Sequence, residues 1–344
     1  MAEPSPPAQF IPRFRTDVYP FIAPSKFRGS LKDKVTIITG AVGVIGQGLA
    51  ESFAVAGAKL ILTYNNTPPS PALSARCLEL GASSVEFIKC NVASLEGCQD
   101  LVNQTITTYN TIDVLINNAG ANGLGPFDAQ PPESFIFDLA VNLHGPYYLM
   151  RLCLPHLRAA SAGCVLNIAS RAGTVAVPYS ASYCASKAAL IHLTACVQSE
   201  MDAEGEGVHL YALHPGGIKS AMTVKKYSAE SVQSIPGEAT RERFARALEI
   251  YNDSPYLNGM VCVALATGVG RDVLRGRYVD VGQDLEDVLA QGEALKADPE
   301  LNVLYTKFLG GLSNAGVPPG GTPCRRRGLS FLGFDSVCKF LCIF

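Results

Sequence analysis

A tyrosine and a lysine one helical turn apart carry the clearest chemical signal in this sequence. Tyr183-Cys-Ala-Ser-Lys187 puts a phenol and an ammonium group on the same face of a helix. Side chains of these two types can exchange protons with a bound molecule, and this placement lets both serve one site. The same spacing also occurs on exposed helices without a function, so it needs support from other residues.

Polar residues at the ends of two apolar runs supply that support. Ser170 follows the run 164–169, and Asn117-Asn118-Ala119-Gly120 closes the run that begins at residue 113. Runs in which polar and apolar residues do not alternate are typical of strands buried on both faces. In an open parallel sheet, ligands bind at the carboxyl ends of such strands. We therefore expect Ser170 and the tyrosine–lysine pair to lie around one pocket.

The strands that must position these residues all show the same sequence pattern. Short apolar, β-branched runs separated by helical stretches recur along the chain and predict strands at 34–39, 59–63, 84–89, 113–117, 164–169, 208–213 and 277–281. Alternating strands and helices imply a parallel sheet with right-handed crossovers. The expected fold class is α/β, with a single Rossmann-like doubly wound parallel sheet and helices on both faces.

A glycine-rich turn lies between the first predicted strand and the helix after it. In Thr39-Gly40-Ala-Val-Gly43-Val-Ile-Gly46, glycines would let backbone amides and a helix N-terminus approach a pyrophosphate. This predicts a dinucleotide site; the alternative is a turn that only packs helix on strand. Sites for NAD(H) usually carry an acid after the second strand, where this chain has Thr63-Tyr64-Asn65-Asn66-Thr67. NADP(H) differs from NAD(H) by a 2′-phosphate on the ribose that such an acid binds. Because no carboxylate would repel that phosphate, NADP(H) is expected in preference to NAD(H).

The length of 344 residues would allow two domains, but the composition does not change between residues 31 and 290. The sequence therefore predicts one catalytic domain with additions at both ends. These parts are an extended N-terminal arm (1–30), the NAD(P)-binding Rossmann-fold domain (31–290), a helical extension (291–313) and an irregular tail (314–344). Within the arm, apolar side chains are expected to pack onto the body, namely Tyr19, Phe21, Ile22 and Phe27.

Composition and charge limit the function classes. With 48% hydrophobic and 17% charged residues the chain can bury a large core, which excludes a disordered chain. The net charge of −2 gives no electrostatic reason to expect nucleic acid or a membrane as partner, so a small-molecule substrate is expected. The eleven cysteines contain no CxxC pair and the five histidines form no ligand pattern, so no metal is assigned. Scattered thiols and the lack of a secretory signal predict a cytoplasmic protein.

Together these motifs resemble the short-chain dehydrogenase/reductase family. The resemblance covers residues 31–285, and the matching pieces occur in the family's order. They are the glycine turn at 39–46, Asn117-Asn-Ala-Gly120, Asn142, Ser170, Tyr183 with Lys187, and Pro215-Gly-Gly-Ile218.

The resemblance implies a role for four catalytic residues. Tyr183 would protonate a carbonyl oxygen, or take the proton in the reverse direction. Lys187, together with the positive nicotinamide ring, would lower the pKa of the phenol and would hold the nicotinamide ribose. Ser170 would hydrogen-bond the substrate oxygen, and Asn142 would hold a water of a proton relay. The implied cofactor contacts are Gly40, Gly43, Ile45, Gly46, Tyr64, Asn65, Asn91, Val92, Asn118, Ala119, Gly120, Tyr183, Lys187, Pro215, Gly216 and Ile218.

Two positions depart from the family's usual pattern, and the resemblance also indicates substrate contacts, a lid and an interface. The turn reads TGxxGxxG rather than TGxxxGxG, and Asn91 stands where an aspartate usually contacts the adenine. Arg171 and Tyr179 lie on the loop that lines the family's substrate pocket, and residues 217–256 are long enough for a lid over it. The many small residues of the helix 183–200, with the resemblance, imply a helical interface in a homodimer or homotetramer.

The expected function is that of an NADP(H)-dependent oxidoreductase that interconverts a ketone and a secondary alcohol on a small apolar molecule. The additions at both ends suggest a specialised reaction, such as a step of secondary-metabolite biosynthesis. Two alternatives stay open. The TGxxGxxG spacing favours a nucleotide-sugar epimerase or dehydratase, but no added substrate domain is present. The second alternative is a non-catalytic protein that senses a dinucleotide. The presence of Asn142, Ser170, Tyr183 and Lys187 together argues against it.

Overall fold

A computed structural model describes residues 10–160, 162–205, 207–226, 233 and 235–306. The described residues up to 304 belong to a first compact unit, and Tyr305 begins a second. The predicted tail at 314–344 lies outside the described residues. The elements and sites below all belong to the first unit.

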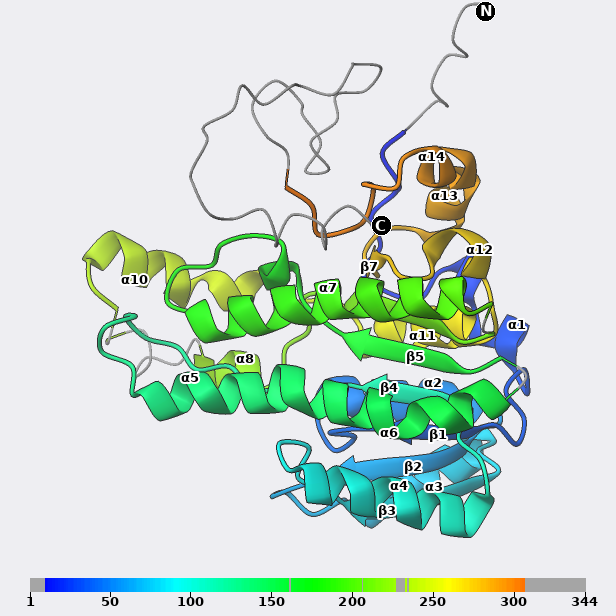
Figure 1. Cartoon of the computed structure of the whole chain (residues 1–344). Helices are drawn as coiled ribbons and strands as arrows, with labels where there is room; N and C mark the ends of the chain where they lie inside the picture. Colours follow the sequence, from blue (N-terminus) through cyan, green and yellow to red (C-terminus); the bar gives the residue numbers. More distant parts are fainter. Residues whose placement is uncertain (1–9, 161, 206, 227–232, 234, 307–344) are drawn as a thin grey trace, which may run out of the picture. The chain divides into compact units, whose positions relative to one another are not determined.

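A seven-stranded parallel sheet forms the centre of the first unit (Figure 1). Its order is β3-β2-β1-β4-β5-β6-β7, and every neighbouring pair is parallel. The strands are β1 (Val35–Ile38), β2 (Lys59–Tyr64), β3 (Ser84–Lys89), β4 (Val114–Asn117), β5 (Cys164–Ile168), β6 (His209–His214) and β7 (Tyr278–Asp280). All residues of β1, β4 and β5 are buried because helices cover both faces. The predicted fold class and the seven predicted strands are confirmed.

The helices form one layer on each side of the sheet (Figure 1). One apolar cluster joins the sheet to α2 (Val44–Val55), α3 (Pro71–Leu80) and α11 (Pro255–Ala266), and a second joins it to α4 (Leu95–Tyr109), α6 (Gly145–Ala159) and α7 (Ala181–Ala203). Within β1, Ile38 belongs to the first cluster and Ile37 to the second, as expected for side chains that alternate across a strand. Further helices are α1 (Pro24–Phe27), α5 (Pro132–Leu139), α8 (Ala221–Lys226), α10 (Glu238–Ala245), α12 (Arg271–Leu274), α13 (Leu285–Ala290) and α14 (Gly292–Ala297).

Two glycines let α2 and α11 approach closely. A Cβ atom at Gly48 would lie 2.8 Å from the carbonyl oxygen of Pro255, and one at Gly259 would lie 2.7 Å from the carbonyl oxygen of Gly48. Both distances are too short for carbon and oxygen atoms that are not bonded. Close packing therefore requires glycine at both positions, and it fixes the helix that follows the glycine turn.

The N-terminal arm is helical over part of its length rather than extended. Pro20 and Pro24 begin the short helices η1 (Pro20–Ile22) and α1, because the fixed φ of proline suits the start of a helix. The side chains of Tyr19, Ile22 and Phe27 are buried in the first apolar cluster. The arm thus packs onto the body, as its apolar residues predicted.

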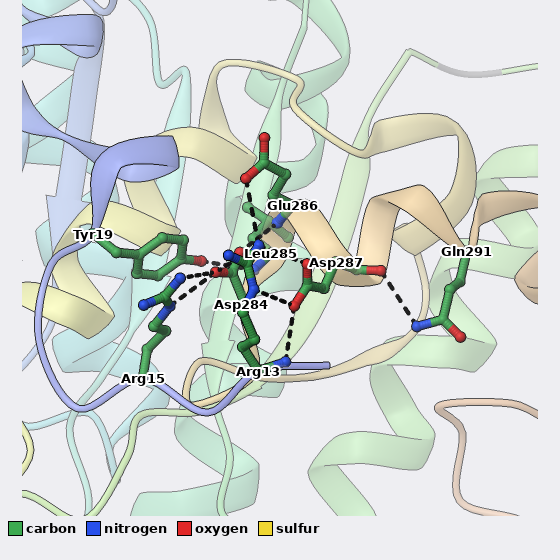
Figure 2. Close-up of polar contacts among 8 residues, drawn as sticks. All are labelled: Arg13, Arg15, Tyr19, Asp284, Leu285, Glu286, Asp287 and Gln291. Atoms are coloured by element: carbon green, nitrogen blue, oxygen red, sulfur yellow. Dashed lines mark hydrogen bonds and ion pairs between the residues drawn. The ribbon is translucent and has the colours of Figure 1, made fainter. Parts of the chain in front are cut away.

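Charged residues tie this arm to the segment that follows β7 (Figure 2). Asp284 is fully buried, and its carboxylate accepts a hydrogen bond of 2.8 Å from Arg15 Nε and pairs with Arg15 Nη2 at 2.8 Å. Arg13 donates two hydrogen bonds to Asp287, of 2.8 Å from Nε and 2.7 Å from Nη2. We call Arg13, Arg15, Asp284 and Asp287 the N-terminal clasp. It connects the first described residues of the chain to the start of α13.

The predicted helical extension at 291–313 is described as far as residue 306. Only α14 is helical within that part. The helix ends at Ala297, two residues before Pro299, because the residue before a proline disfavours helical geometry.

Candidate active site

Helix α7 carries the tyrosine–lysine pair at the carboxyl edge of the sheet. Ser182, Ser186 and Lys187 are buried on its inward face. The Lys187 Nζ donates a hydrogen bond of 2.7 Å to the carbonyl oxygen of Ile168 and lies 5.7 Å from the centre of the Tyr183 ring. Because Ile168 ends β5, this bond attaches the helix to the edge at which ligands of such sheets bind.

Ser170 lies beside Tyr183, two residues after β5. The two side chains are hydrogen-bonded to each other, and the Ser170 Oγ also accepts a hydrogen bond of 3.2 Å from the Ala172 N–H at the start of η3 (Arg171–Gly173). Both residues line a cavity of about 440 Å³, which we call the tyrosine cavity. An oxygen atom of a molecule bound there could contact both hydroxyl groups.

Burial sets the protonation states of the tyrosine and the lysine. It raises the pKa of Tyr183 to about 12, although the hydrogen bond with Ser170 acts in the opposite direction. It also lowers the pKa of Lys187 to about 8. In the protein without cofactor, the pKa of Tyr183 is therefore raised and not lowered as the resemblance implied. The reason is that burial removes water from the phenol, which disfavours the charged phenolate. At neutral pH, Tyr183 is protonated and Lys187 is mostly charged.

Asn142 lies in a π-helical turn between α5 and α6 (η2, Ala140–His144), a feature that is frequent at functional sites. Its Oδ1 accepts a hydrogen bond of 2.9 Å from the Ala121 N–H. Its Nδ2 donates to the Ala121 carbonyl oxygen at 2.8 Å and to the Ser186 Oγ at 3.0 Å. Because both ends of the amide are engaged, Asn142 holds the loop after β4 against α7.

Asp138 also belongs to the site and was not predicted from the sequence. Its side chain is buried on α5 and accepts hydrogen bonds from the Gly123 N–H, at 2.9 Å, and from the Ser182 Oγ. Its negative charge raises the pKa of Lys187 and so opposes the effect of burial. The signal in the sequence was an acidic residue within the apolar stretch 135–141.

A second cavity, of about 470 Å³, lies over the glycine turn, and we call it the glycine-turn cavity. It adjoins the tyrosine cavity, since Ile45, Ser220 and Met222 line both. The predicted cofactor contacts that line it are Gly40, Gly43, Ile45, Gly46, Tyr64, Asn65, Asn91, Val92, Asn118, Ala119 and Gly120. Those that line the tyrosine cavity are Ile45, Tyr183, Pro215, Gly216 and Ile218, whereas Lys187 lines neither cavity.

The geometry of the glycine turn leaves room for an anion. Gly40 has a φ of +62°, and a Cβ atom there would lie 3.0 Å from Ala119 Cα. A Cβ atom at Gly43 would meet only the Gly40 carbonyl oxygen, at 3.7 Å, so this side of the turn is open. Helix α2 follows at once, and the N–H groups before Gln47 have no partner within the helix. A pyrophosphate therefore fits this turn despite its TGxxGxxG spacing.

Asn118, directly after β4, supports the glycine turn with its side chain. Asn118 Nδ2 donates hydrogen bonds to the carbonyl oxygens of Thr39, at 2.8 Å, and Gly40, at 3.1 Å. Asn117 Nδ2 donates to the Oδ1 of buried Asn167 at 2.8 Å. Asn118 thus lines the glycine-turn cavity while its side-chain nitrogen holds the turn in place.

The end of β2 closes the glycine-turn cavity with uncharged polar groups. The lining residues there are Thr63, Tyr64, Asn65, Asn66 and Thr67. Among all described residues that line this cavity, none is acidic or basic. A phosphate group bound here would meet hydroxyl and amide groups.

The two predicted substrate contacts differ in position. Arg171 lines the tyrosine cavity and forms an ion pair of 2.7 Å with Asp280. Tyr179 does not line that cavity, because its ring packs edge-on against Phe244, with 5.8 Å between the ring centres. The loop therefore supplies the first of these side chains to the cavity but not the second.

The predicted lid at 217–256 includes residues 227–232 and 234, which lie outside the described part. Its described residues form α8, α10 and the short helix η4 (Ala247–Ile250). Ile250 and Asp253 from this segment line the tyrosine cavity, as does His214 at the end of β6. His214 and Asp253 were not predicted from the sequence; the only signal for His214 is its place directly before Pro215.

Comparison with known proteins agrees with this geometry. The family model described as short chain dehydrogenase matches residues 34–231. A short chain dehydrogenase of Pseudocercospora fijiensis is 29% identical over 283 residues, 81% of this chain and 90% of that protein. The 11-beta-hydroxysteroid dehydrogenase 1A of Arabidopsis thaliana is 31% identical over 259 residues, 74% of this chain and 69% of that protein. A solved short-chain dehydrogenase/reductase from Burkholderia xenovorans has a TM-score of 0.65 and 23% identity, with 75% of this chain and 98% of that chain covered.

The matched region contains the glycine turn and the residues around the tyrosine cavity that α7 and β5 supply. Within the described part of the chain, no helix has the length and apolar character that a membrane span requires. The chain therefore belongs to the short-chain dehydrogenase/reductase family and is an NAD(P)-dependent oxidoreductase that acts on CH–OH groups.

Proposed function

We propose that this enzyme uses NADP(H) to interconvert a ketone and a secondary alcohol on a small apolar molecule. The observation that carries the proposal is the hydrogen-bonded pair of Tyr183 and Ser170 in a cavity that adjoins the glycine-turn cavity. When it is bound, the nicotinamide cofactor supplies or accepts the hydride. The protein supplies position, a proton and stabilisation of charge.

Tyr183 and Ser170 act on the substrate oxygen in this proposal. In reduction, the protonated phenol of Tyr183 gives its proton to the carbonyl oxygen, and the Ser170 hydroxyl stabilises the developing negative charge. With a pKa of about 12, Tyr183 holds this proton at neutral pH. In oxidation the phenol must first lose it, which Lys187 would favour together with the positive ring of the bound nicotinamide. Near neutral pH the protein is therefore in the protonation state that reduction requires.

Lys187 also has donors left for the cofactor. One of the three N–H groups of its ammonium binds the Ile168 carbonyl oxygen. A Cβ atom at Gly120, which lines the glycine-turn cavity, would lie 3.9 Å from Nζ, so the other two N–H groups can reach hydroxyl groups of a nicotinamide ribose bound there. Asp138 assists by favouring the charged form of the lysine.

The preference for NADP(H) rests on the end of β2. An acid at this position would bind the ribose hydroxyls of NAD(H) and repel a phosphate, whereas the residues that line the cavity here are uncharged. We expect kcat/KM for NADPH to exceed that for NADH by at least about tenfold, or ~1.4 kcal/mol. Equal use of both cofactors would contradict the preference.

The proposed substrate is apolar because the tyrosine cavity is largely apolar. Among the residues that line it are Ile45, Val175, Val177, Ile218, Met222 and Ile250. The volume of about 440 Å³ lies within the usual range for small-molecule sites. The Arabidopsis relative is named for a hydroxysteroid, which accords with an apolar alcohol. The additions outside the matched family region support a specialised reaction, such as a step of secondary-metabolite biosynthesis.

We also propose a homodimer or homotetramer in the cytoplasm. Apolar side chains outside the two cavities are exposed on α5 and α6, namely Ile136 and Tyr147, and a helical interface would cover them. The free, mostly buried thiols of the described cysteines accord with a reducing compartment. Light scattering on the eluting protein should give a multiple of the 36.5 kDa chain mass, and a monomer at micromolar concentration would contradict the assembly.

The test of the reaction is NADPH oxidation with a panel of apolar ketones, from aliphatic to polycyclic. We expect turnover of some members. Tight NADPH binding without turnover of any ketone would contradict the proposal. Interconversion of nucleotide-linked sugars without net oxidation of the cofactor would favour the epimerase alternative instead.

A further inference from the structure

Two neighbouring polar groups form a part of the wall of the tyrosine cavity that the proposed reaction does not use. They are His214, the last residue of β6, and Asp253, which directly precedes the N-cap residue of α11. Both line the cavity together with Ser170 and Tyr183. A molecule whose carbonyl group lies at Tyr183 would therefore present another part of its surface to this wall.

His214 offers a hydrogen-bond donor. Its Nδ1 accepts a hydrogen bond of 3.3 Å from the Arg171 N–H. Burial lowers the pKa of His214 to about 4, although the charge of Asp280 opposes this shift, so the imidazole is neutral at physiological pH. A neutral imidazole whose Nδ1 accepts a hydrogen bond carries its hydrogen on Nε2. The Nε2–H makes no hydrogen bond to the described residues.

Asp253 offers a hydrogen-bond acceptor that is held in place. Its Oδ2 accepts a hydrogen bond of 2.6 Å from the Gly217 N–H, and its own N–H donates to the Gly217 carbonyl oxygen at 3.0 Å. A Cβ atom at Gly216 would lie 2.9 Å from the same Oδ2, so the carboxylate packs directly on the backbone of this turn. The other oxygen, Oδ1, has no partner among the described residues.

The charge of this wall restricts the substrate further. Arg171 is the one cationic side chain among the described residues that line the cavity, and Asp280 already neutralises it at 2.7 Å. Arg171 forms its ion pair with Asp280 and not with Asp253, so the carboxylate of Asp253 makes no ion pair with the described residues and would repel a carboxylate or phosphate group on the substrate. A substrate ammonium group would suit Asp253 but would face the Nε2–H donor of His214. A hydroxyl group suits both, because it donates one hydrogen bond and accepts another.

We propose that His214 and Asp253 bind a second hydroxyl group of the substrate, so that the substrate is an uncharged hydroxyketone or the corresponding diol. This inference rests on the proposed ketone–alcohol reaction at Tyr183. The hydroxyl donates to Asp253 Oδ1 and accepts from His214 Nε2–H, while the reacting carbonyl lies at Ser170 and Tyr183.

The experiment compares matched ketones with NADPH as the cofactor. The probes are hydroxycyclohexanones and hydroxydecalones, each beside its analogue without the hydroxyl group and its analogue with a carboxylate. In the wild type we expect kcat/KM for the best hydroxyketone to exceed that of its deoxy analogue by about tenfold or more, the usual effect of a hydrogen bond to a charged group. The carboxylate analogues should be the poorest substrates.

Variants at the two residues separate recognition from folding. Asp253→Asn keeps an oxygen for the Gly217 N–H, so the turn should persist. We expect this variant to bring the hydroxyketone preference close to one and to improve the carboxylate analogues by about tenfold relative to the deoxy ketones. His214→Phe should lower the hydroxyketone preference in the same way. Asp272→Asn, which alters an exposed carboxylate, is the matched control and should change nothing.

The outcomes distinguish this inference from the proposed reaction. Turnover of ketones without a hydroxyl preference, or a preference that persists in both Asp253→Asn and His214→Phe, would overturn the hydroxyl subsite and leave the reaction standing. A lack of turnover with every ketone would overturn the reaction and the subsite together.

Discussion

Loss of Arg15 should destabilise the protein strongly, because its partner in the N-terminal clasp is fully buried. In Arg15→Met the Asp284 carboxylate would lose both contacts of 2.8 Å. It would keep the Glu286 N–H at 3.0 Å and a distant Arg13 Nη2 at 3.5 Å. Removing one partner of a buried ion pair typically costs about 3–5 kcal/mol.

The expected loss lies at or just below the low end of that range. The Arg15 side chain is 29% exposed, so water already screens part of the interaction and can reach the carboxylate once the arginine is gone. We expect the free energy of unfolding to fall by about 2–3 kcal/mol. At roughly 2–4 °C for each kcal/mol in a chain of this size, Tm should fall by about 4–12 °C.

Urea and thermal unfolding of four variants measure this effect. Arg76→Met is the control, because Arg76 is exposed and its nearest carboxylate oxygen is 3.6 Å away; its effect should stay within about 0.5 kcal/mol. Asp284→Asn keeps the oxygen that caps α13. Arg15→Met combined with Asp284→Asn should therefore recover much of the loss, since no unpaired carboxylate remains buried. A wild-type Tm in Arg15→Met, or a double variant as unstable as the sum of the two single changes, would refute this reasoning.

Three further predictions follow from contacts elsewhere in the fold. Burial lowers the pKa of His209 to about 4; because the unfolded chain binds the proton more readily, the free energy of unfolding should decrease as the pH falls from about 6.5 to 4, by up to ~1.4 kcal/mol per pH unit. Urea titrations should show a shallower decrease in His209→Leu, and an identical slope would contradict the assignment. Gly259→Ala should cost about 1–3 kcal/mol by forcing α2 and α11 apart, measured as a lower urea midpoint, whereas an unchanged midpoint would show that the helices can separate freely. Ser170→Ala should lower kcat by about 100-fold and leave the NADPH Kd unchanged; a loss confined to NADPH binding would remove Ser170 from the chemistry.

The parallel sheet could be predicted from the sequence because its strands are buried on both faces and read as uninterrupted apolar runs. Val35–Ile38, Val114–Asn117 and Cys164–Ile168 are the clearest examples, and all their residues are buried. Parallel strands place the residues that follow them at one edge of the sheet. For this reason the sequence alone predicts that Ser170 and Tyr183 lie around one pocket.

The site residues that were not predicted join the site through contacts between separate segments, and such contacts leave no local sequence pattern. Asp138 becomes part of the site only because α5 packs beside α7, and Asp253 lines the tyrosine cavity because its turn pairs with Gly217. Tyr179 lies on the expected loop, but its ring packs on Phe244 and not into the cavity. The direction of the Tyr183 pKa shift depends on burial, which spacing does not show.

The N-terminal clasp was beyond prediction for a related reason. Arg15 and Asp284 are 269 positions apart. Neither stands in a motif, and exposed charges of either sign are ordinary in both segments. The apolar residues of the arm indicated that it packs onto the body, but only the fold shows where.

The most direct test of the central claim is the turnover of Tyr183→Phe with a ketone that the wild type reduces. The account predicts that kcat falls by roughly 100-fold or more, because the phenol hydroxyl provides the proton, while the Kd for NADPH stays close to the wild-type value. Wild-type turnover by Tyr183→Phe would contradict the account, whatever the other measurements show.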